Sequence, residues 1–162
     1  MALNAYLRMT GEIQGEIRGS TTLADREGSI MVIAFEHEMT SPRDAATGMP
    51  TGKRQHHAIT ITKEIDRSSP RLMRMLINNE RITEWELRFW QPSKGGKEEQ
   101  YYTIRLEDAS VSAIRQEMLN NRYPENMEHK EREHISFCYR RIVWSYVDEG
   151  ISAEDSWEAP NA

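Results

Sequence analysis

Residues 134–147 read HISFCYRRIVWSYV, and the pattern of this stretch gives the clearest prediction about the fold. Its apolar residues stand first at odd positions and then at even ones: Ile135, Phe137 and Tyr139, followed by Ile142, Trp144 and Tyr146. A β-strand keeps one face for each parity, so one straight strand cannot place all of them on the same side. The change of parity at Arg140-Arg141 therefore predicts a bulge or a sharp corner of the backbone.

Short segments with strand periodicity recur along the rest of the chain. Apolar residues alternate with polar ones within residues 4–9, 57–65, 83–89, 102–106 and 109–113. β-Branched and aromatic residues, which fit a pleated and half-buried surface, are frequent in these segments. Many short strands joined by turn-rich connections predict a mainly β fold, either a compact barrel or a sandwich of two sheets.

One short α-helix is expected over about residues 70–79. Ser69 has the side chain of a good N-cap, and Pro70 suits the first helical position. Apolar residues then recur at helical spacing: Leu72, Met73, Leu76 and Ile77. Asn78-Asn79 ends the helix, which we expect to cover an open end or a flank of the β structure.

A long extended loop is expected at residues 41–52, between two apolar strands. Its prolines and glycines favour a defined turn over a random linker. Hairpin connections usually need only about two to five residues, so a loop of this length points to a function of its own. Charged residues of both signs stand near its two ends and could make polar contacts: Arg43, Asp44, Lys53 and Arg54.

The size and composition of the chain suit one globular domain. It has 162 residues, of which 38% are hydrophobic and 29% are charged. No apolar run approaches the ~20 residues that a membrane span needs, and no signal-peptide pattern precedes the first strand. We therefore expect a single domain over residues 1–162 that is made in the cytoplasm and does not insert into a membrane. If it leaves the cell, we expect it to do so without a cleaved signal peptide.

The net charge of −5 is concentrated at the C-terminus. Residues 148–162 contain neither lysine nor arginine but several acidic residues: Asp148, Glu149, Glu154, Asp155 and Glu158. Residues 1–147 then hold equal numbers of acidic and basic residues, 21 of each. An acidic C-terminal tail and a body without a basic stripe argue against nucleic-acid binding.

The residues that could carry chemistry lack the spacing that such chemistry needs. Adjacent His56 and His57 point to opposite faces of a strand, and no HxH, HExxH or CxxC pattern supplies a metal site. Cys138, the single cysteine, falls within a predicted strand, where a small apolar role explains it. Helix capping explains Ser69, and no GxSxG elbow or phosphate loop occurs. The sequence therefore predicts no catalytic residue, no metal ligand and no cofactor.

Two predicted strands are apolar on both faces. Residues 30–35 form a continuous apolar block, IMVIAF, and residues 142–146 are similar. A sheet with one face in water shows alternation instead, so the helix or another subunit must cover the second face. Candidate core or interface residues are Ile33, Phe35, Ile142, Trp144 and Tyr146, together with Trp157 near the C-terminus.

Several of these segments together resemble the haemolysin-coregulated protein (Hcp) family of type VI secretion systems. Residues 59–72, ITITKEIDRSSPRL, are similar to the family's Thr-Lys-x-Ile-Asp-x-Ser-Ser/Thr-Pro-x-Leu signature at a strand-to-helix junction. Residues 5–17, 106–114 and 137–144 resemble its first strand, a strand in mid-domain and its closing strand. Asp155-Ser156-Trp157 resembles the Asp-Trp ending of one branch of the family.

The resemblance implies a structural subunit and not an enzyme, and it implies no cofactor. In the family, six copies form a ring, and rings stack into a hollow inner tube. A contractile sheath drives the tube, tipped by a trimeric spike protein, out of the cell, and small effector proteins travel in the lumen. The loop that matches residues 41–52 helps one ring to meet the next. Arg43, Asp44, Lys53 and Arg54 are then candidates for the ring-stacking contact.

Two other interpretations are compatible with the sequence alone. The chain could be a cytosolic β-sandwich that binds a ligand or hydrolyses a substrate, which would need a clustered polar pocket. It could also be a sheath or baseplate adaptor of the same machine, which would share partners with the tube but form no ring of its own.

Overall fold

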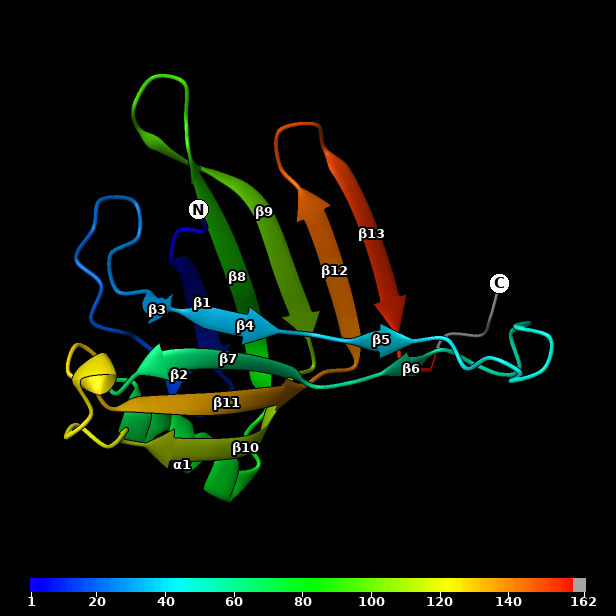
Figure 1. Ribbon diagram of the computed structural model, residues 1–162, viewed down its shortest axis with the longest axis horizontal. Coiled ribbons are helices and arrows are strands. Elements are labelled where there is room, and N and C mark those ends of the chain that lie inside the picture. The colour runs from blue at the N-terminus through cyan, green and yellow to red at the C-terminus, as the bar shows by residue number, and fades with distance from the viewer. Residues whose placement is uncertain (159–162) are drawn as a thin grey trace.

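The computed structural model describes residues 1–158 and contains two packed antiparallel β-sheets with one α-helix beside them (Figure 1). The larger sheet has seven strands in the order β13-β12-β9-β8-β1-β2, with β3 also paired to β1. These strands are β1 (Ala5–Gly11), β2 (Gly15–Glu16), β3 (Ile30–Val32), β8 (Ile82–Pro92), β9 (Glu98–Glu107), β12 (Arg141–Tyr146) and β13 (Ile151–Ser156).

The smaller sheet has four strands in the order β10-β11-β7-β4. They are β4 (Ala34–Glu36), β7 (Ile59–Glu64), β10 (Ser110–Glu117) and β11 (Arg132–Cys138). Over residues 1–158 the two sheets do not close into a barrel. The predicted mainly β fold is confirmed, and of its two expected forms the sandwich is the one observed.

The predicted corner in residues 134–147 is confirmed. β11 ends at Cys138 in the smaller sheet, and β12 begins at Arg141 in the larger one. The backbone N–H of Arg140 donates to the carbonyl of Glu107 at 3.0 Å and so ties the corner to the end of β9. The apolar parity changes because the chain leaves one sheet and enters the other.

The apolar block at residues 30–35 is not one strand buried on both faces, so that prediction was wrong. The chain bends at Ile33, where it passes from β3 in the larger sheet to β4 in the smaller one. Ile30 and Val32 are buried, whereas Ile33 and Phe35 keep 42% and 41% of their surface exposed. β4 is the edge strand of the smaller sheet and all three of its residues are exposed, so the second half of the block faces outward.

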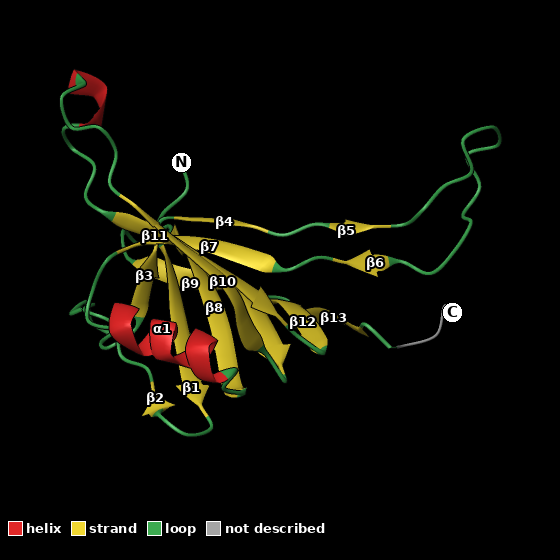
Figure 2. Cartoon of the chain, turned by 90° about the horizontal axis from the view of Figure 1, so that it is seen from below, coloured by secondary structure: helices red, strands yellow, loops and turns green. Residues whose placement is uncertain are grey.

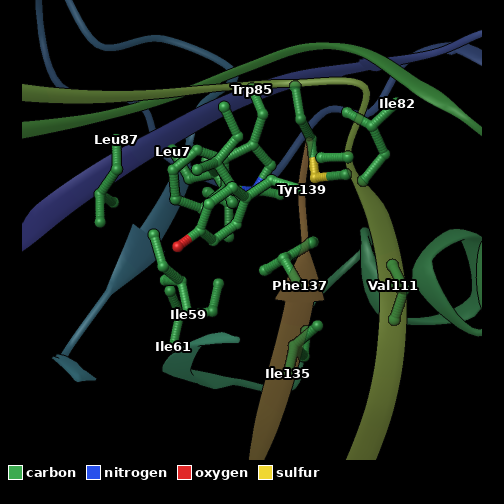
Figure 3. Packing of buried hydrophobic residues seen from close by; sticks show 14 of the residues in the cluster. Leu7, Ile59, Ile61, Ile82, Trp85, Leu87, Val111, Ile135, Phe137 and Tyr139 are labelled. Carbon is green, nitrogen blue, oxygen red and sulfur yellow. The ribbon is translucent and has the colours of Figure 1, made fainter. Parts of the chain in front are cut away.

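The hydrophobic core lies between the two sheets. Trp85 of β8 and Phe137 of β11 meet edge to face at its centre, with ring centroids 5.4 Å apart. Ile59, Ile61 and Ile135 belong to the same core cluster and lie below Phe137 in Figure 3. Burying one such side chain contributes roughly 1.5–3 kcal/mol.

Helix α1 (Ser69–Asn78) lies on the flank of the sandwich next to β10 (Figure 2). Its N-cap is Ser68, and Ser69 belongs to the first turn, which corrects the expected cap by one residue. Leu72 and Met75 are buried, whereas Ile77 is exposed. The face of the helix that packs on the core is therefore rotated about the helix axis from the expected face. Asn79 ends the helix in the left-handed conformation at φ 48°, as a C-terminal Asn often does.

A long hairpin, the arm, projects from the sandwich (Figures 1 and 2). Its short strands β5 (Met39–Thr40) and β6 (Gln55–His56) pair with each other, and residues 41–54 form the loop between them. The acidic C-terminal segment, expected as a tail, instead contributes β13 to the larger sheet beside β12. The loop at residues 120–131 contains a 3-10 turn, η1 (Pro124–Asn126).

Candidate functional site

The loop of the arm is an ordered turn. The carboxylate of Asp44 accepts hydrogen bonds from the backbone N–H of Thr47 at 2.7 Å, from that of Ala46 at 2.9 Å, and from the Thr47 hydroxyl at 3.0 Å. These bonds, the one from the Thr47 N–H foremost, lower the pKa of Asp44. Asp44 therefore holds the shape of the loop, while Arg43 and Lys53 are exposed along it.

The base of the arm is held to β13. The guanidinium of Arg54 donates to both carboxylate oxygens of Asp155, at 2.5 Å for the Nη2–Oδ1 contact, and to the carbonyl of Ser156 at 3.3 Å. Hydrogen bonding to Arg54 is the main reason why the pKa of Asp155 falls to about 2. Of the four charged residues expected for ring stacking, Arg54 and Asp44 thus make contacts within the subunit, and Arg43 and Lys53 point outward.

Aromatic rings surround this ion pair. Trp157 stacks on His56 with ring centroids 5.7 Å apart and planes 20° from parallel. The hydroxyl of Tyr139 lies 2.8 Å from His56 Nδ1 and 2.8 Å from His37 Nε2. Trp144, which is half-buried, packs beside His37 at 6.3 Å between centroids. Two of the predicted interface residues, Trp144 and Trp157, therefore lie at the base of the arm, each against a different histidine.

Sequence reasoning missed this cluster, because its members come from distant parts of the chain. From the sequence, His56 was a candidate only for a metal site, and Asp155 belonged to the acidic tail and to the Asp-Trp resemblance. Nothing in the spacing singled out His37. The usable signal was the recurrence of histidine, tyrosine and tryptophan at strand ends, but the spacing of those residues does not indicate which strand ends meet.

An apolar groove opens on another part of the surface. It encloses about 460 Å³ and is lined by the N-terminal residues and by β3, β4, β8 and β9. Phe35 packs edge-on against Phe89 at 5.0 Å between centroids, and Phe89 contacts Tyr102 at 5.7 Å. Ile33 joins Phe35 in its lining, so the structure brings two of the predicted interface residues together here.

The other two predicted interface residues differ in exposure. Tyr146 is exposed and lies edge-on to Tyr101, which lines the groove, at 6.4 Å between centroids. Ile142 is fully buried in the core and therefore cannot contact another subunit while the fold is intact.

The strand-to-helix junction at residues 59–72 contains a buried polar network. Lys63 lies on the same inward face as Ile59 and Ile61, and its Nζ donates to Glu133 Oε1 at 2.5 Å. The hydroxyl of Ser69 donates to the same carboxylate oxygen at 2.7 Å. Ile65, which continues the alternation of Ile59 and Ile61 in the sequence, is exposed, because β7 ends before it at Glu64.

The hydroxyl of Ser68 completes the junction by donating to Asp66 Oδ1 at 2.5 Å. Asp66 also lies 3.0 Å from Lys63 Nζ, so the lysine bridges two carboxylates. The signature residues of this segment thus join β7, β11 and the start of α1 through hydrogen bonds. These residues therefore have a structural role.

The described residues, 1–158, contain no group of three or more histidine, cysteine, aspartate and glutamate side chains placed to hold a metal ion. Cys138 is half-buried on β11. Within the same range, the structure has no helix whose length and apolar character would let it cross a membrane.

Comparison with known proteins identifies the family. A family model described as a type VI secretion system effector, Hcp, matches residues 6–146. The chain belongs to the Hcp family. Its role is therefore that of a subunit of the type VI secretion tube, and the Hcp family is a family of structural tube proteins.

Individual relatives agree with this Hcp assignment. The "Major exported protein" of Pseudomonas aeruginosa is 38% identical over 171 residues, which cover 100% of this chain and 99% of the relative. A crystal structure of an Hcp protein is 28% identical with a TM-score of 0.90, over 97% of this chain and 99% of that one. A mutant form of Hcp1 from Escherichia coli EAEC 042 is 33% identical with a TM-score of 0.86, over 96% and 99% of the two chains.

Proposed function

We propose that this Hcp chain assembles into closed rings of six and that the rings stack into a hollow tube. The exposed apolar groove carries the proposal. Ile33 and Phe35 expose large apolar side chains beside Phe89 and Tyr102, and a contiguous patch of this kind marks a protein contact site. A ring requires a head-to-tail contact whose rotation closes. Each contact between neighbours should bury roughly 1,200–2,000 Å².

The arm is the proposed stacking element. It extends beyond the sandwich, and its loop has a defined shape held by Asp44. Arg43 and Lys53 present positive charge along it. In this proposal Arg54 supports stacking from within the subunit, by fixing the base of the arm to Asp155, and does not itself contact the next ring.

The remaining parts of the proposal rest on the Hcp family. Residues 1–162 act as one tube-protein domain that is assembled in the cytoplasm and secreted by the type VI system. Its partners are the trimeric spike protein, the contractile sheath and small effector proteins in the lumen. The name of the Pseudomonas relative, a major exported protein, supports secretion.

The chain acts as a structural protein and not as a hydrolase. The serine hydroxyls at the junction donate to carboxylates inside the fold, Ser68 to Asp66 and Ser69 to Glu133. A nucleophilic serine needs an adjacent general base and access to substrate, and Ser69 is buried in the first turn of α1. These contacts support the structural role over the hydrolase alternative.

The test of the ring compares two substitutions of exposed isoleucines on different surfaces. Ile33→Glu places a charge in the groove, whereas Ile77→Glu places one on the outer side of α1. Light scattering and negative-stain microscopy should find rings for the wild type and for Ile77→Glu, and single subunits for Ile33→Glu. A wild type that stays a single chain at micromolar concentration would refute the ring. If rings persist in Ile33→Glu, the lateral contact between neighbouring subunits does not lie at the groove.

A further inference from the structure

Five polar side chains from distant segments meet at the base of the arm and form what we call the clasp. They are His37 between β4 and β5, Arg54 and His56 at β6, Tyr139 at the corner between the sheets, and Asp155 in β13. The clasp connects both strands of the arm to the sandwich, because His37 precedes β5 whereas Arg54 and His56 lie at β6. Tyr139 and Asp155 belong to the sandwich.

We propose that the clasp is a proton-sensitive switch, which fixes the arm to the sandwich while at most one of its two histidines is charged and releases it when both are. The proposal rests on the directions in which the hydrogen bonds of the clasp can run. It concerns a single subunit and does not depend on the proposed ring.

The directions follow from Asp155. A carboxylate only accepts hydrogen bonds, so His56 Nε2, which lies 2.8 Å from Asp155 Oδ2, must carry a hydrogen. Neutral His56 then has a bare Nδ1, which accepts from the hydroxyl of Tyr139 at 2.8 Å. The oxygen of Tyr139 in turn accepts from His37 Nε2, also at 2.8 Å. Every donor in this chain meets an acceptor.

One added proton can be accommodated. If His56 becomes charged, its Nδ1 donates to the oxygen of Tyr139, and the Tyr139 hydroxyl turns to donate to His37 Nε2. Neutral His37 accepts that bond in its other tautomer. The chain of hydrogen bonds has reversed, but none has been lost.

A second proton breaks the pattern. With both rings charged, His37 and His56 both direct N–H groups at the oxygen of Tyr139, and the hydroxyl hydrogen no longer meets an acceptor ring nitrogen. Arg54 and charged His56 already contact the single carboxylate of Asp155, and charged His37 adds a third cation to the cluster without a carboxylate partner of its own there. A buried group left without its hydrogen bond and a cluster of like charges are both unfavourable.

The surroundings offer little to offset that charge. On the arm, a hydrogen bond to the backbone of His57 favours charged His37, whereas the charge of the His57 ring opposes it. Glu36 and Glu38 flank His37 in sequence and are exposed. At the corner, Arg140 pairs with Glu158 across the surface. The remaining walls of the clasp are aromatic: Trp157 over His56 and Trp144 beside His37.

Burial of His37, and next the neighbouring charge of His56, lower the pKa of His37 below its ordinary value of 6.5. The unfolded chain therefore binds this proton more readily than the folded one does. The contribution of neutral His37 is complete above pH 6.5 and is lost as the pH falls below that value. Asp155, with a pKa of about 2, stays ionised through this range.

The switch has a consequence for assembly that does rest on the proposed function. An arm freed from Asp155 and Tyr139 loses its fixed direction, and a stacking element must be oriented before it can meet the next ring. Mild acid should then separate stacked rings from one another before the subunits unfold.

Hydrogen exchange followed by mass spectrometry tests the clasp in the subunit itself. The full chain is compared at about pH 7.5 and about pH 5, on either side of the ordinary histidine pKa, after correction for the intrinsic exchange rates. Ring mass is checked at both values. Amides of residues 37–57 should exchange roughly tenfold faster at the lower pH, the factor expected for loss of one ordinary hydrogen bond. Amides of β8 serve as the internal reference for global folding.

Substitutions identify the groups responsible. His37→Gln keeps a side chain that can donate and accept but cannot be charged, so the response of the arm to pH should disappear. Tyr139→Phe removes the shared hydroxyl and should leave the arm exchanging fast at both pH values. His129→Gln, in the exposed loop before β11, should respond as the wild type does. A wild-type arm whose protection does not change with pH, or a full response retained by His37→Gln, would overturn the proposal.

Discussion

Lys63 Nζ lies 2.5 Å from Glu133 Oε1, and both side chains are completely buried. The pair joins β7 to β11, and Ser69 and Asp66 extend it to the start of α1. A buried ion pair is weak evidence for stability by itself, since desolvation opposes the Coulombic attraction. Here it fixes the register of two strands and the entry of the helix with one set of contacts.

Removing one partner of this pair should be costly. Lys63→Ala leaves Glu133 as a buried carboxylate without its cation, and we expect a loss of about 3–5 kcal/mol in the free energy of unfolding. The double variant Lys63→Met/Glu133→Leu should recover most of that loss. Denaturant unfolding measures both, with exposed Lys94→Ala as the control. If the single variant proves as stable as the wild type, the pair is not buried as described.

The tryptophans should differ according to their burial. Trp85→Ala empties the centre of the core and should lower the free energy of unfolding by about 3–5 kcal/mol. Trp144 is only half-buried beside His37, so Trp144→Ala should cost clearly less. Thermal unfolding of the two variants, measured side by side, checks the order. An equal loss would mean that assembly covers the exposed part of Trp144.

Gly11 allows a close approach between the end of β1 and the C-terminal end of α1. A Cβ added there would overlap the carboxylate of Glu80, which is buried, and the methyl group of Met75. Gly11→Ala should therefore destabilise the subunit by roughly 1–3 kcal/mol, the usual cost of overpacking. Gly52→Ala is the matched control, because no atom lies within 4 Å of its added Cβ. Similar melting temperatures for the two variants would contradict the close approach.

Shortening the arm should separate ring formation from stacking. A variant in which a short glycine-containing turn replaces residues 43–50 keeps β5, β6 and the clasp, and long surface loops can be trimmed at small entropic cost. We expect rings of normal mass, no stacked tubes and no export from cells. Normal export would remove the stacking role of the arm. Loss of the rings themselves would place the arm in the lateral contact.

The ionisation of Asp155 should depend on Arg54. Hydrogen bonding to Arg54 is the largest cause of its low pKa of about 2, against an ordinary value of 3.8. Because the folded-state pKa is depressed, the stabilisation is complete above pH 3.8 and is lost as the pH falls toward 2. In Arg54→Gln the pKa should rise toward the ordinary value, which carboxyl titration by NMR can follow. A pKa that stays near 2 would assign the depression to His56 and the backbone instead.

The parity of apolar residues predicted much of the fold. The change at Arg140-Arg141 located the corner between the sheets, and the spacing after Pro70 located the helix. The prediction of one doubly covered strand at residues 30–35 was wrong. A segment that changes sheets at Ile33 can have the same apolar composition as a strand covered on both faces, so composition does not separate the two. The exposed half of this segment nevertheless belongs to the groove, so the choice of Ile33 and Phe35 as candidate contacts agrees with their exposure.

The sequence alone predicted most of the longer strands, the single helix, the long arm and the resemblance to the Hcp family, but not β13. These follow from periodicity and motif order, which are local properties of the chain. Only the tertiary structure decided that Glu133 neutralises Lys63, that Asp155 holds Arg54 and His56, and that Tyr139 lies between two histidines. Such contacts join residues as many as 102 positions apart, and strand pairing brings them together without leaving a trace in the spacing of either partner.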